Sequence, residues 1–250
     1  MAVRVGTSGF AYKEWKGSFY PDDLPAAKML GFYAARFDTV EINNTFYRMP
    51  QASALSGWAS EVHVPVPAFA FALKAPMWIT HLKKLEELKE PARQFFALVV
   101  ETMGTHLGPV LLHLPAYLKR DPENVDRLRR FFDLVPEGVR IAVEPSDPSW
   151  HHEELYGLLR EKRAALAAVD DPKKQVPVIA TTSWGYVRLR KVVYKKPELA
   201  KWVETVAKEP WSESFVFFKH EDGGTGPKLG KRFQDLAGRY VIPSTRTAGK

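Results

Sequence analysis

Two short runs near the start of the chain decide the fold: Val3-Arg4-Val5-Gly6-Thr7-Ser8 and Thr39-Val40-Glu41-Ile42-Asn43-Asn44. Each run is mostly apolar where it begins and polar where it ends. Between them, residues 26–37 carry apolar side chains at the spacing of one helical face. A strand, a helix and a second strand are therefore predicted, and this is the repeating unit of a parallel sheet.

The same alternation continues to the end of the chain. The predicted strands are Val3–Gly6, Thr39–Ile42, Phe69–Lys74, Val110–Leu114, Arg140–Val143, Ala165–Val169, Gly185–Leu189 and Ser214–Phe218. The predicted helices are Ala26–Phe37, Ser53–Glu61, Lys84–Thr102, Pro122–Leu134, His152–Arg163, Pro197–Lys208 and Pro227–Ala237. Most of the strands are nearly continuous apolar runs, as expected where both faces of a sheet are covered.

Eight strands in 250 residues predict a single (β/α)8 TIM-type barrel, taken as one domain over residues 1–250. Residues 170–184 are too short for a full helix, so the barrel is predicted to be irregular, with a short connection before strand seven. A doubly wound sheet is the alternative, because one sequence does not give the order of the strands.

The composition excludes several classes of protein. The chain has no cysteine, which removes disulfides, thiolate nucleophiles and Cys-ligated zinc. It shows no signal peptide and no apolar run long enough to cross a bilayer, so a cytoplasmic protein without a membrane partner is expected. The formal net charge of +7 favours anionic partners. The sequence gives no oligomeric state.

In a barrel of this kind, the residues at the carboxyl ends of the strands meet at one rim. The candidates there are Thr7, Ser8, Glu41, Asn43, Lys74, His81, His113, Glu144, Asp170 and Arg188. Several of the charged ones lie inside or against apolar runs, and a charge buried there needs a partner. A shared polar pocket is therefore predicted.

Two glycine-containing segments are candidate anion sites. Small residues in Gly6-Thr7-Ser8-Gly9 would let backbone amides approach an anion, although a tight turn at the rim explains them equally well. Residues 221–228, Glu221-Asp222-Gly223-Gly224-Thr225-Gly226-Pro227-Lys228, would form either a phosphate cradle or a lid.

A metal and a nucleic acid are the remaining alternatives. No cofactor is predicted, but a divalent metal stays open, because His81, His113, His220, Glu41, Glu144 and Asp170 are chemically suitable ligands without short ligand spacing. Residues 186–196 mix basic and aromatic side chains, which is the composition of a nucleic-acid patch and also of a barrel strand running into a solvated loop.

Several longer stretches carry a family resemblance. They are Val5-Gly6-Thr7-Ser8-Gly9-Phe10, Trp15-Lys16-Gly17-Ser18-Phe19-Tyr20-Pro21, residues 37–47 (Phe37-Asp38-Thr39-Val40-Glu41-Ile42-Asn43-Asn44-Thr45-Phe46-Tyr47), Phe71-Ala72-Leu73-Lys74-Ala75-Pro76, Ile79-Thr80-His81 and Tyr186-Val187-Arg188-Leu189. Over about 240 residues the chain resembles the DUF72 family, also called YecE-like. The resemblance implies a TIM-type barrel and a pocket, but no reaction.

The resemblance also marks departures from the family pattern. His113 stands where the family usually has Gln, Arg190-Lys191 where it has His-Gly, and Lys219-His220 where it has an Asn pair. The first half of the implied pocket is kept and the second half is rewritten.

Together these observations predict an enzyme, a hydrolase or an isomerase, that acts on a small anionic substrate, phosphorylated or carbohydrate-like. Glu41 and Glu144 are the predicted base and acid. Lys74 and Arg188 would hold negative charge, and His113 or His81 would carry a proton. The alternative is a nucleic-acid-binding or metal-dependent nucleic-acid-processing protein that uses the basic rim.

Overall fold

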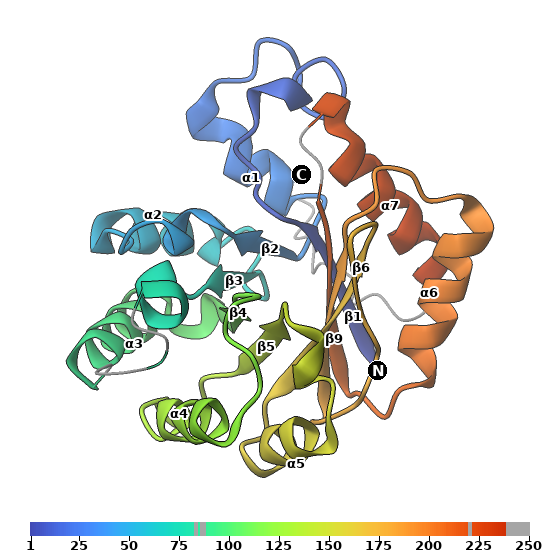
Figure 1. Ribbon diagram of the computed structural model, residues 1–250. Coiled ribbons are helices and arrows are strands. Elements are labelled where there is room, and N and C mark those ends of the chain that lie inside the picture. Colours follow the sequence, from blue (N-terminus) through green and yellow to red (C-terminus); the bar gives the residue numbers. More distant parts are fainter. Residues whose placement is uncertain (83–84, 86–88, 220–221, 239–250) are drawn as a thin grey trace.

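The computed structural model describes residues 1–82, 85, 89–219 and 222–238 (Figure 1). The strands are β1 (Ala2–Thr7), β2 (Thr39–Ile42), β3 (Ala70–Lys74), β4 (Leu107–Leu114), β5 (Ile141–Pro145), β6 (Ala165–Asp171), β7 (Lys174–Val176), β8 (Trp184–Leu189) and β9 (Glu213–Phe218). The helices are α1 (Met29–Ala34), α2 (Ala52–His63), α3 (Lys89–Met103), α4 (Pro122–Phe132), α5 (Glu153–Glu161), α6 (Lys196–Lys208) and α7 (Thr225–Ala237).

Eight parallel strands of the described chain follow the order β1-β9-β8-β6-β5-β4-β3-β2. The first and last strands pair along their whole length, and β2 returns to β1 through a single bridge between Ser8 and Glu41. The helices follow one another around the outside of the strands (Figure 1). The predicted TIM-type barrel is therefore confirmed, and it is nearly closed.

The connection between β6 and β8 holds the short strand β7 and, in the described chain, no helix. β7 runs antiparallel to β6 and forms a hairpin with it, which pairs Asp171 with Lys174. The predicted irregularity before strand seven, which is β8, is confirmed. None of the described helices is long and apolar enough to cross a membrane.

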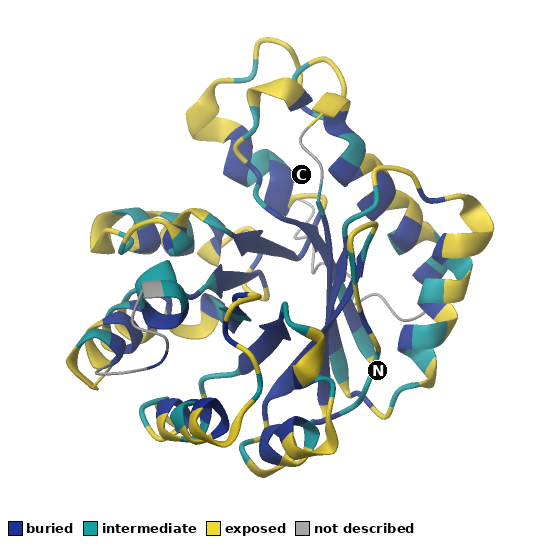
Figure 2. Cartoon of the chain, viewed as in Figure 1, coloured by how far each residue is buried: buried dark blue, intermediate teal, exposed yellow. Residues whose placement is uncertain are grey.

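Helix boundaries follow from local chemistry. The side chain of Asp121 accepts a hydrogen bond from the Asn124 amide at 2.7 Å, and Pro122 occupies the first turn of α4. An acceptor before the first turn satisfies an amide that has no partner in the helix, and proline there loses no hydrogen bond. The outer helices bury one face and expose the other (Figure 2).

The inside of the barrel is filled by large side chains from one side and by small side chains from the other. Trp184, Tyr186, Phe215 and Phe217 come from the neighbouring strands β8 and β9, and alanines fill the space opposite, from β3, β5 and β6. Phe215, Phe217 and Tyr186 have no exposed surface. The barrel strands are mostly dark blue in Figure 2, because they are covered inside and outside. Apolar packing thus fills the middle of the barrel, so a polar pocket can form only toward the carboxyl ends of the strands.

Charged residues close the amino-terminal end of the barrel. Glu213 accepts hydrogen bonds from Arg4 and Arg140, both at 2.5 Å. The Arg140 guanidinium lies 4.8 Å from the centre of the Phe215 ring, so the ion pairs rest on the apolar core. A hydrogen-bonded ion-pair network at this end serves stability, because active sites of such barrels lie at the other end.

The seam between β1 and β2 depends on side chains instead of a regular strand ladder. The Tyr33 hydroxyl accepts from the Thr7 amide at 2.8 Å and donates to the Thr39 carbonyl at 3.0 Å. The Asp38 carboxylate accepts from the Val5 amide at 3.0 Å. A Cβ on Gly6 would lie 2.1 Å from the Thr39 carbonyl oxygen, so only glycine permits this approach.

The seam gives a testable prediction. Tyr33→Phe leaves the Thr7 amide and the Thr39 carbonyl buried without a partner, and the free energy of unfolding is expected to fall by about 1–3 kcal/mol. Urea denaturation measures it. Tyr156→Phe is the control, because its ring is only half-buried and its hydroxyl makes no described hydrogen bond. Equal stability of the two variants would contradict a linking role for Tyr33.

Candidate functional site

Side chains alternate between the two faces of each strand, and this places a layer of polar side chains next to the apolar core, at the carboxyl ends of the strands. Residues two apart on a strand share a face, so Lys74 follows Ala72 into the barrel, and Arg188 follows Tyr186. By the same rule His113 follows Leu111, Glu144 follows Ala142, and Glu41 lies beside Ala72 in the register of β2 and β3. The predicted convergence of Glu41, Lys74, His113, Glu144 and Arg188 at one end is what the structure shows.

Arg188 lies at the centre of this layer and is 3% exposed. Its Nη2 donates to Glu41 Oε1 at 2.8 Å, and its Nη1 donates to Glu144 Oε2. Both carboxylates have no exposed surface. One guanidinium therefore joins two strands that are far apart in sequence, and each partner makes burial of the other tolerable.

Hydrogen bonds complete the surroundings of Glu41. Ser8 Oγ donates to its Oε1 at 2.8 Å, Asn43 Nδ2 to the same atom at 3.1 Å, and the Tyr186 hydroxyl to Oε2 at 2.7 Å. Burial by itself would raise the pKa of Glu41, but the charge of Arg188 and these donors hold it below its usual value. Glu41 is thus a fully bonded carboxylate, which makes it a weak base.

Glu144 has a second cationic partner. Lys174 Nζ, on β7, donates to Glu144 Oε1 at 2.5 Å and to Ser146 Oγ at 3.3 Å. Despite its burial, the pKa of Glu144 lies well below its usual value because of Arg188, His113 and Lys174. The sequence did not indicate a role for Lys174, because this residue lies in a short connection whose hairpin pairing gives no periodic pattern.

His113 lies against this cluster as a neutral ring. Its Nε2 lies 2.8 Å from Ser146 Oγ and 3.9 Å from Glu144 Oε1. Burial lowers the pKa of His113 to about 3; the charge of Glu144 opposes this shift, and the nearby cations Lys74, Lys174 and Arg188 add to it. At neutral pH the ring is therefore uncharged.

Lys74 differs from the other cations of the layer. Its Nζ lies 3.9 Å from the centre of the Phe46 ring, and no carboxylate of a described residue forms an ion pair with it. Burial first, and then the charge of Arg188, lower the pKa of Lys74 to about 8. A substantial fraction of this amine is thus neutral near physiological pH.

A pocket of about 310 Å³ opens above the layer. Its described lining residues are Ser8, Tyr12, Asn43, Asn44, Phe46, Tyr47, Lys74, Arg188, Arg190 and Lys219. Four of these are cationic and none carries a carboxylate. The volume suits a small molecule. Of the sequence candidates, Ser8, Asn43, Lys74 and Arg188 therefore line one cavity, while Glu41 and Glu144 lie behind Arg188.

Besides Glu41, Glu144 and His113, three more sequence candidates lie outside this lining. Thr7 is buried and donates to the Gly9 carbonyl at 2.6 Å, which shapes the end of β1. Asp170 pairs with Lys191 at 3.1 Å and accepts from Trp202 of α6 at 3.2 Å, so it faces outward from the barrel. His81 packs edge-on against Phe46 with ring centres 5.0 Å apart, beside the pocket.

Of the two interpretations of the Gly6–Gly9 segment, an amide site for an anion or a tight turn at the rim, the backbone contacts favour the turn. The Ser8 amide donates to the Phe218 carbonyl at 2.9 Å, and the Gly9 amide donates to the Glu41 carbonyl at 2.8 Å. With the Thr7 amide bound to Tyr33, these donors are all used within the protein. These amides are therefore used in a tight turn at the rim, while the Ser8 side chain lines the pocket.

The glycine-rich segment before α7 packs away from the pocket. A Cβ on Gly224 would lie 2.4 Å from Ser18 Oγ, and Lys228 Nζ donates to the Gly223 carbonyl at 2.8 Å. Its described residues, 222–228, contribute nothing to the pocket lining. Glu221, and the candidate ligand His220, lie outside the described residues.

Within the described chain, no three His, Asp or Glu side chains come together as a metal-binding group. Glu41 and Glu144 each turn an oxygen toward Arg188, and Asp170 faces the opposite side of β6. The donor set proposed from the sequence is therefore divided among different partners.

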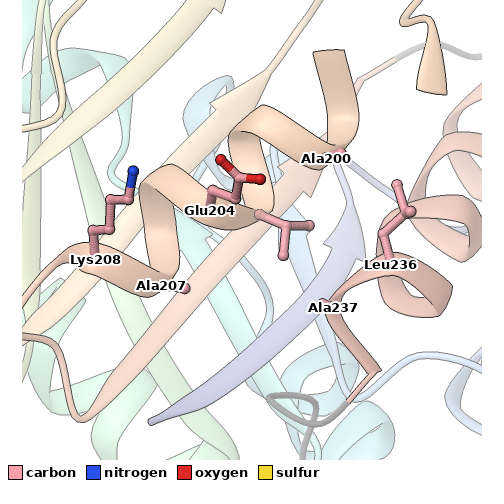
Figure 3. A pocket seen from close by; sticks show the side chains of 7 residues that line it. Ala200, Glu204, Ala207, Lys208, Leu236 and Ala237 are labelled. Carbon is pink, nitrogen blue, oxygen red and sulfur yellow. The ribbon is translucent and has the colours of Figure 1, made fainter. Parts of the chain in front are cut away.

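A second cavity, of about 630 Å³, lies between α6 and α7 and is lined by Ala200, Val203, Glu204, Ala207, Lys208, Leu236 and Ala237 (Figure 3). Its charged side chains, Glu204 and Lys208, are four residues apart on one helix. It lies on the outside of the barrel, shares no described lining residue with the pocket above Arg188, and has no titratable side chain in its described lining beyond these two.

Fold and site define a class: a TIM-type barrel with a cationic pocket at the carboxyl ends of its strands, built on a buried Glu-Arg-Glu network. Within that class the chain belongs to the DUF72 family, whose model, "Protein of unknown function DUF72", matches residues 4–248. The resemblance noted in the sequence is thus confirmed. No curated protein sequence matches the chain.

Solved structures agree with this placement. A DUF72 family protein from Thermotoga maritima is 28% identical, with a TM-score of 0.83 over 94% of this chain and 99% of that one. A DUF72 family protein from Enterococcus faecalis is 20% identical, with a TM-score of 0.75 over 94% and 95%. D-Psicose 3-epimerase from Clostridium cellulolyticum is 11% identical, with a TM-score of 0.56 over 96% and 99%, and shares the fold alone.

The buried network predicts that Arg188→Met changes how the stability of the protein depends on pH. In the wild type, the lowered carboxylate pKa values stabilise the fold above about pH 4.5, and this contribution is lost on acidification. Arg188→Met removes the main counter-charge, so the Glu41 pKa rises above its unfolded value. The variant is expected to lose about 3–5 kcal/mol at pH 7.5 and less at pH 5, because protonation relieves the uncompensated charge.

Urea denaturation at several pH values measures this difference. Adding Glu41→Gln to Arg188→Met should restore part of the stability at pH 7.5, and Arg93→Met, at an exposed site, is the control. A stability difference that does not change between pH 5 and 7.5 would show that Arg188 acts through packing alone.

His113 gives a separate prediction. Because its pKa is lowered to about 3, its imidazole signals in an NMR titration should stay those of a neutral ring from pH 8 down to pH 5. In urea the same signals should titrate near 6.5. Acidification below 6.5 should therefore cost stability in the wild type, and less in His113→Gln. A midpoint above 6 in the folded protein would contradict the assignment.

Proposed function

We propose that this protein is an enzyme that binds a small anionic substrate, phosphorylated or carbohydrate-like, in the pocket above Arg188 and acts on it by proton transfer. One observation carries the proposal: the described lining of the pocket contains four cationic side chains and no carboxylate. A cavity lined by one sign of charge concentrates ligands of the opposite sign.

The contacts favour different roles for these residues. Arg190 and Lys219, which lie at the rim, and Arg188, which lies at the floor, would hold the negative charge of the substrate. Asn43, Asn44 and Tyr12 offer neutral polar groups of the kind that bind the hydroxyls of a carbohydrate.

Lys74 is the proposed proton-transfer group. A general acid or base works best when its pKa lies near the working pH, and the pKa of Lys74 is about 8. The sequence analysis assigned base and acid to Glu41 and Glu144. Their lowered pKa values and saturated hydrogen bonds instead support a positioning role, in which they orient Arg188.

The binding part is tested with ribose 5-phosphate and ribose, a pair that differs only in the phosphate. Isothermal titration calorimetry should show ribose 5-phosphate binding at least about tenfold more tightly, because a charge-assisted hydrogen bond contributes about 1.5–3 kcal/mol. Lys219→Met and Lys74→Met should each weaken binding about tenfold, whereas the exposed control Lys201→Met should not. Affinity of the wild type should fall as the pH rises through about 8.

Two results would count against this proposal. Equal affinity for ribose and its phosphate would remove the anion site. Tight binding of a generic oligonucleotide, with a steep decline as salt is added, would favour the nucleic-acid alternative. The rings of Tyr186 and Tyr194, in the basic and aromatic segment, are 0% and 3% exposed and unavailable for stacking on a base.

A further inference from the structure

Resting on the proposed function, we propose that Lys74 acts as a nucleophile and forms an imine with the carbonyl carbon of an anionic aldehyde or ketone held in the pocket. This assigns a covalent step and a substrate class, small oxo acids and oxo phosphates, to the same site. The proposal rests on the position of the Lys74 amine. It lies in a pocket with three other cationic side chains, and it forms no ion pair with a carboxylate of a described residue.

The position of Lys74 is set by the fold. It is the last residue of β3 and follows Ala70 and Ala72 on the inner face of the barrel. Its carbonyl accepts a hydrogen bond from Thr45 Oγ1 at 2.6 Å, which ties the strand end to the loop after β2. The backbone beneath the amine is therefore fixed, and the flexible part of the side chain enters the cavity.

Other groups in the lining are poorer nucleophiles. The chain has no cysteine. Ser8 Oγ donates to Glu41, whose lowered pKa makes it unable to accept the proton that attack would release. Arg188 and Arg190 remain charged, because a guanidinium is not deprotonated in proteins. An amine that burial and nearby cations keep partly neutral is the usual nucleophile toward a carbonyl group.

Burial is the largest cause of the lowered pKa of Lys74, and charged groups around the amine act in both directions. The charged and titratable groups around Lys74 are Glu41 on β2, Glu144 on β5, Arg188 on β8, Arg190 directly after β8, His81 and His113 beside the pocket, and Lys219 after β9. Both glutamates are already paired with Arg188, so their attraction for the ammonium is offset. Reactivity should therefore increase as the pH rises through about 8.

The chemical step balances without an oxidant. The lone pair of neutral Nζ attacks the carbonyl carbon, the new C–N bond replaces the C=O π bond, and one proton moves from nitrogen to oxygen to give a carbinolamine. The hydroxyl takes up one proton from solvent and leaves as water, while the nitrogen lone pair forms the C=N bond of a protonated imine. The adjacent C–H bond becomes acidic, because the iminium accepts its electron pair, so Lys74 would promote the proposed proton transfer through the imine and not by taking up the proton itself.

The test is reductive trapping. Glyoxylate, an anionic aldehyde, and glycolaldehyde, its neutral counterpart, are each incubated with the full chain and cyanoborohydride at pH 8, and the adducts are located by peptide mass spectrometry. Cyanoborohydride delivers hydride to the imine carbon and gives a stable secondary amine. Glyoxylate should modify Lys74 at least tenfold faster than the surface lysines and at least tenfold faster than glycolaldehyde does, and inorganic phosphate should slow it.

Variants separate the nucleophile from the binding site. Lys74→Arg keeps the positive charge and should abolish the adduct, Lys74→Met should do the same, and Lys201→Met should label as the wild type does. Melting curves establish that each variant is folded.

The outcomes distinguish the two proposals. Binding of ribose 5-phosphate without an adduct at Lys74 would overturn the imine and leave the anion pocket in place. Labelling spread evenly over exposed lysines would also overturn it. Failure to bind the phosphate at all would reject the proposed function itself.

Discussion

The site depends on one interaction, the pairing of buried Arg188 with Glu41 and Glu144. Each of these groups, alone in the barrel, would carry a desolvation penalty of several kcal/mol. Together they form a network of charge-assisted hydrogen bonds that fixes β2, β5 and β8 relative to one another. Lys174 adds the hairpin of β6 and β7 to the same network. The geometry of the pocket floor is therefore set by electrostatics on top of an apolar core.

The network also sets the chemical character of the pocket. Both carboxylates of the layer are paired within the network, so the groups that line the cavity are cationic or neutral. Lys74 gains no described carboxylate partner, and its pKa falls to about 8. A pocket that is positive as a whole, with one amine near its titration point, is suited to anionic ligands and to chemistry that needs a neutral nitrogen.

Some positions that depart from the DUF72 pattern line this pocket. Arg190 and Lys219 replace neutral or weakly basic residues that the resemblance implies, and both contribute to the cationic rim. His113 stands where the resemblance implies a glutamine, and with a pKa lowered to about 3 it is likewise an uncharged hydrogen-bonding group at neutral pH. Compared with the pattern that the resemblance implies, the rim of the pocket carries more positive charge, and the floor has the same Glu41, Glu144 and Arg188.

The sequence alone determined the eight parallel strands and the end of the barrel where Glu41, Lys74, Glu144 and Arg188 meet, because strand period and apolar runs are local properties. It could not determine which carboxylate pairs with which cation. Asp170 resembled the others by position, yet it faces α6, because one residue along a strand reverses its side. Only tertiary contacts between distant segments decided that Lys174 pairs with Glu144 and that amides of the Gly6–Gly9 turn bond to β9 and β2.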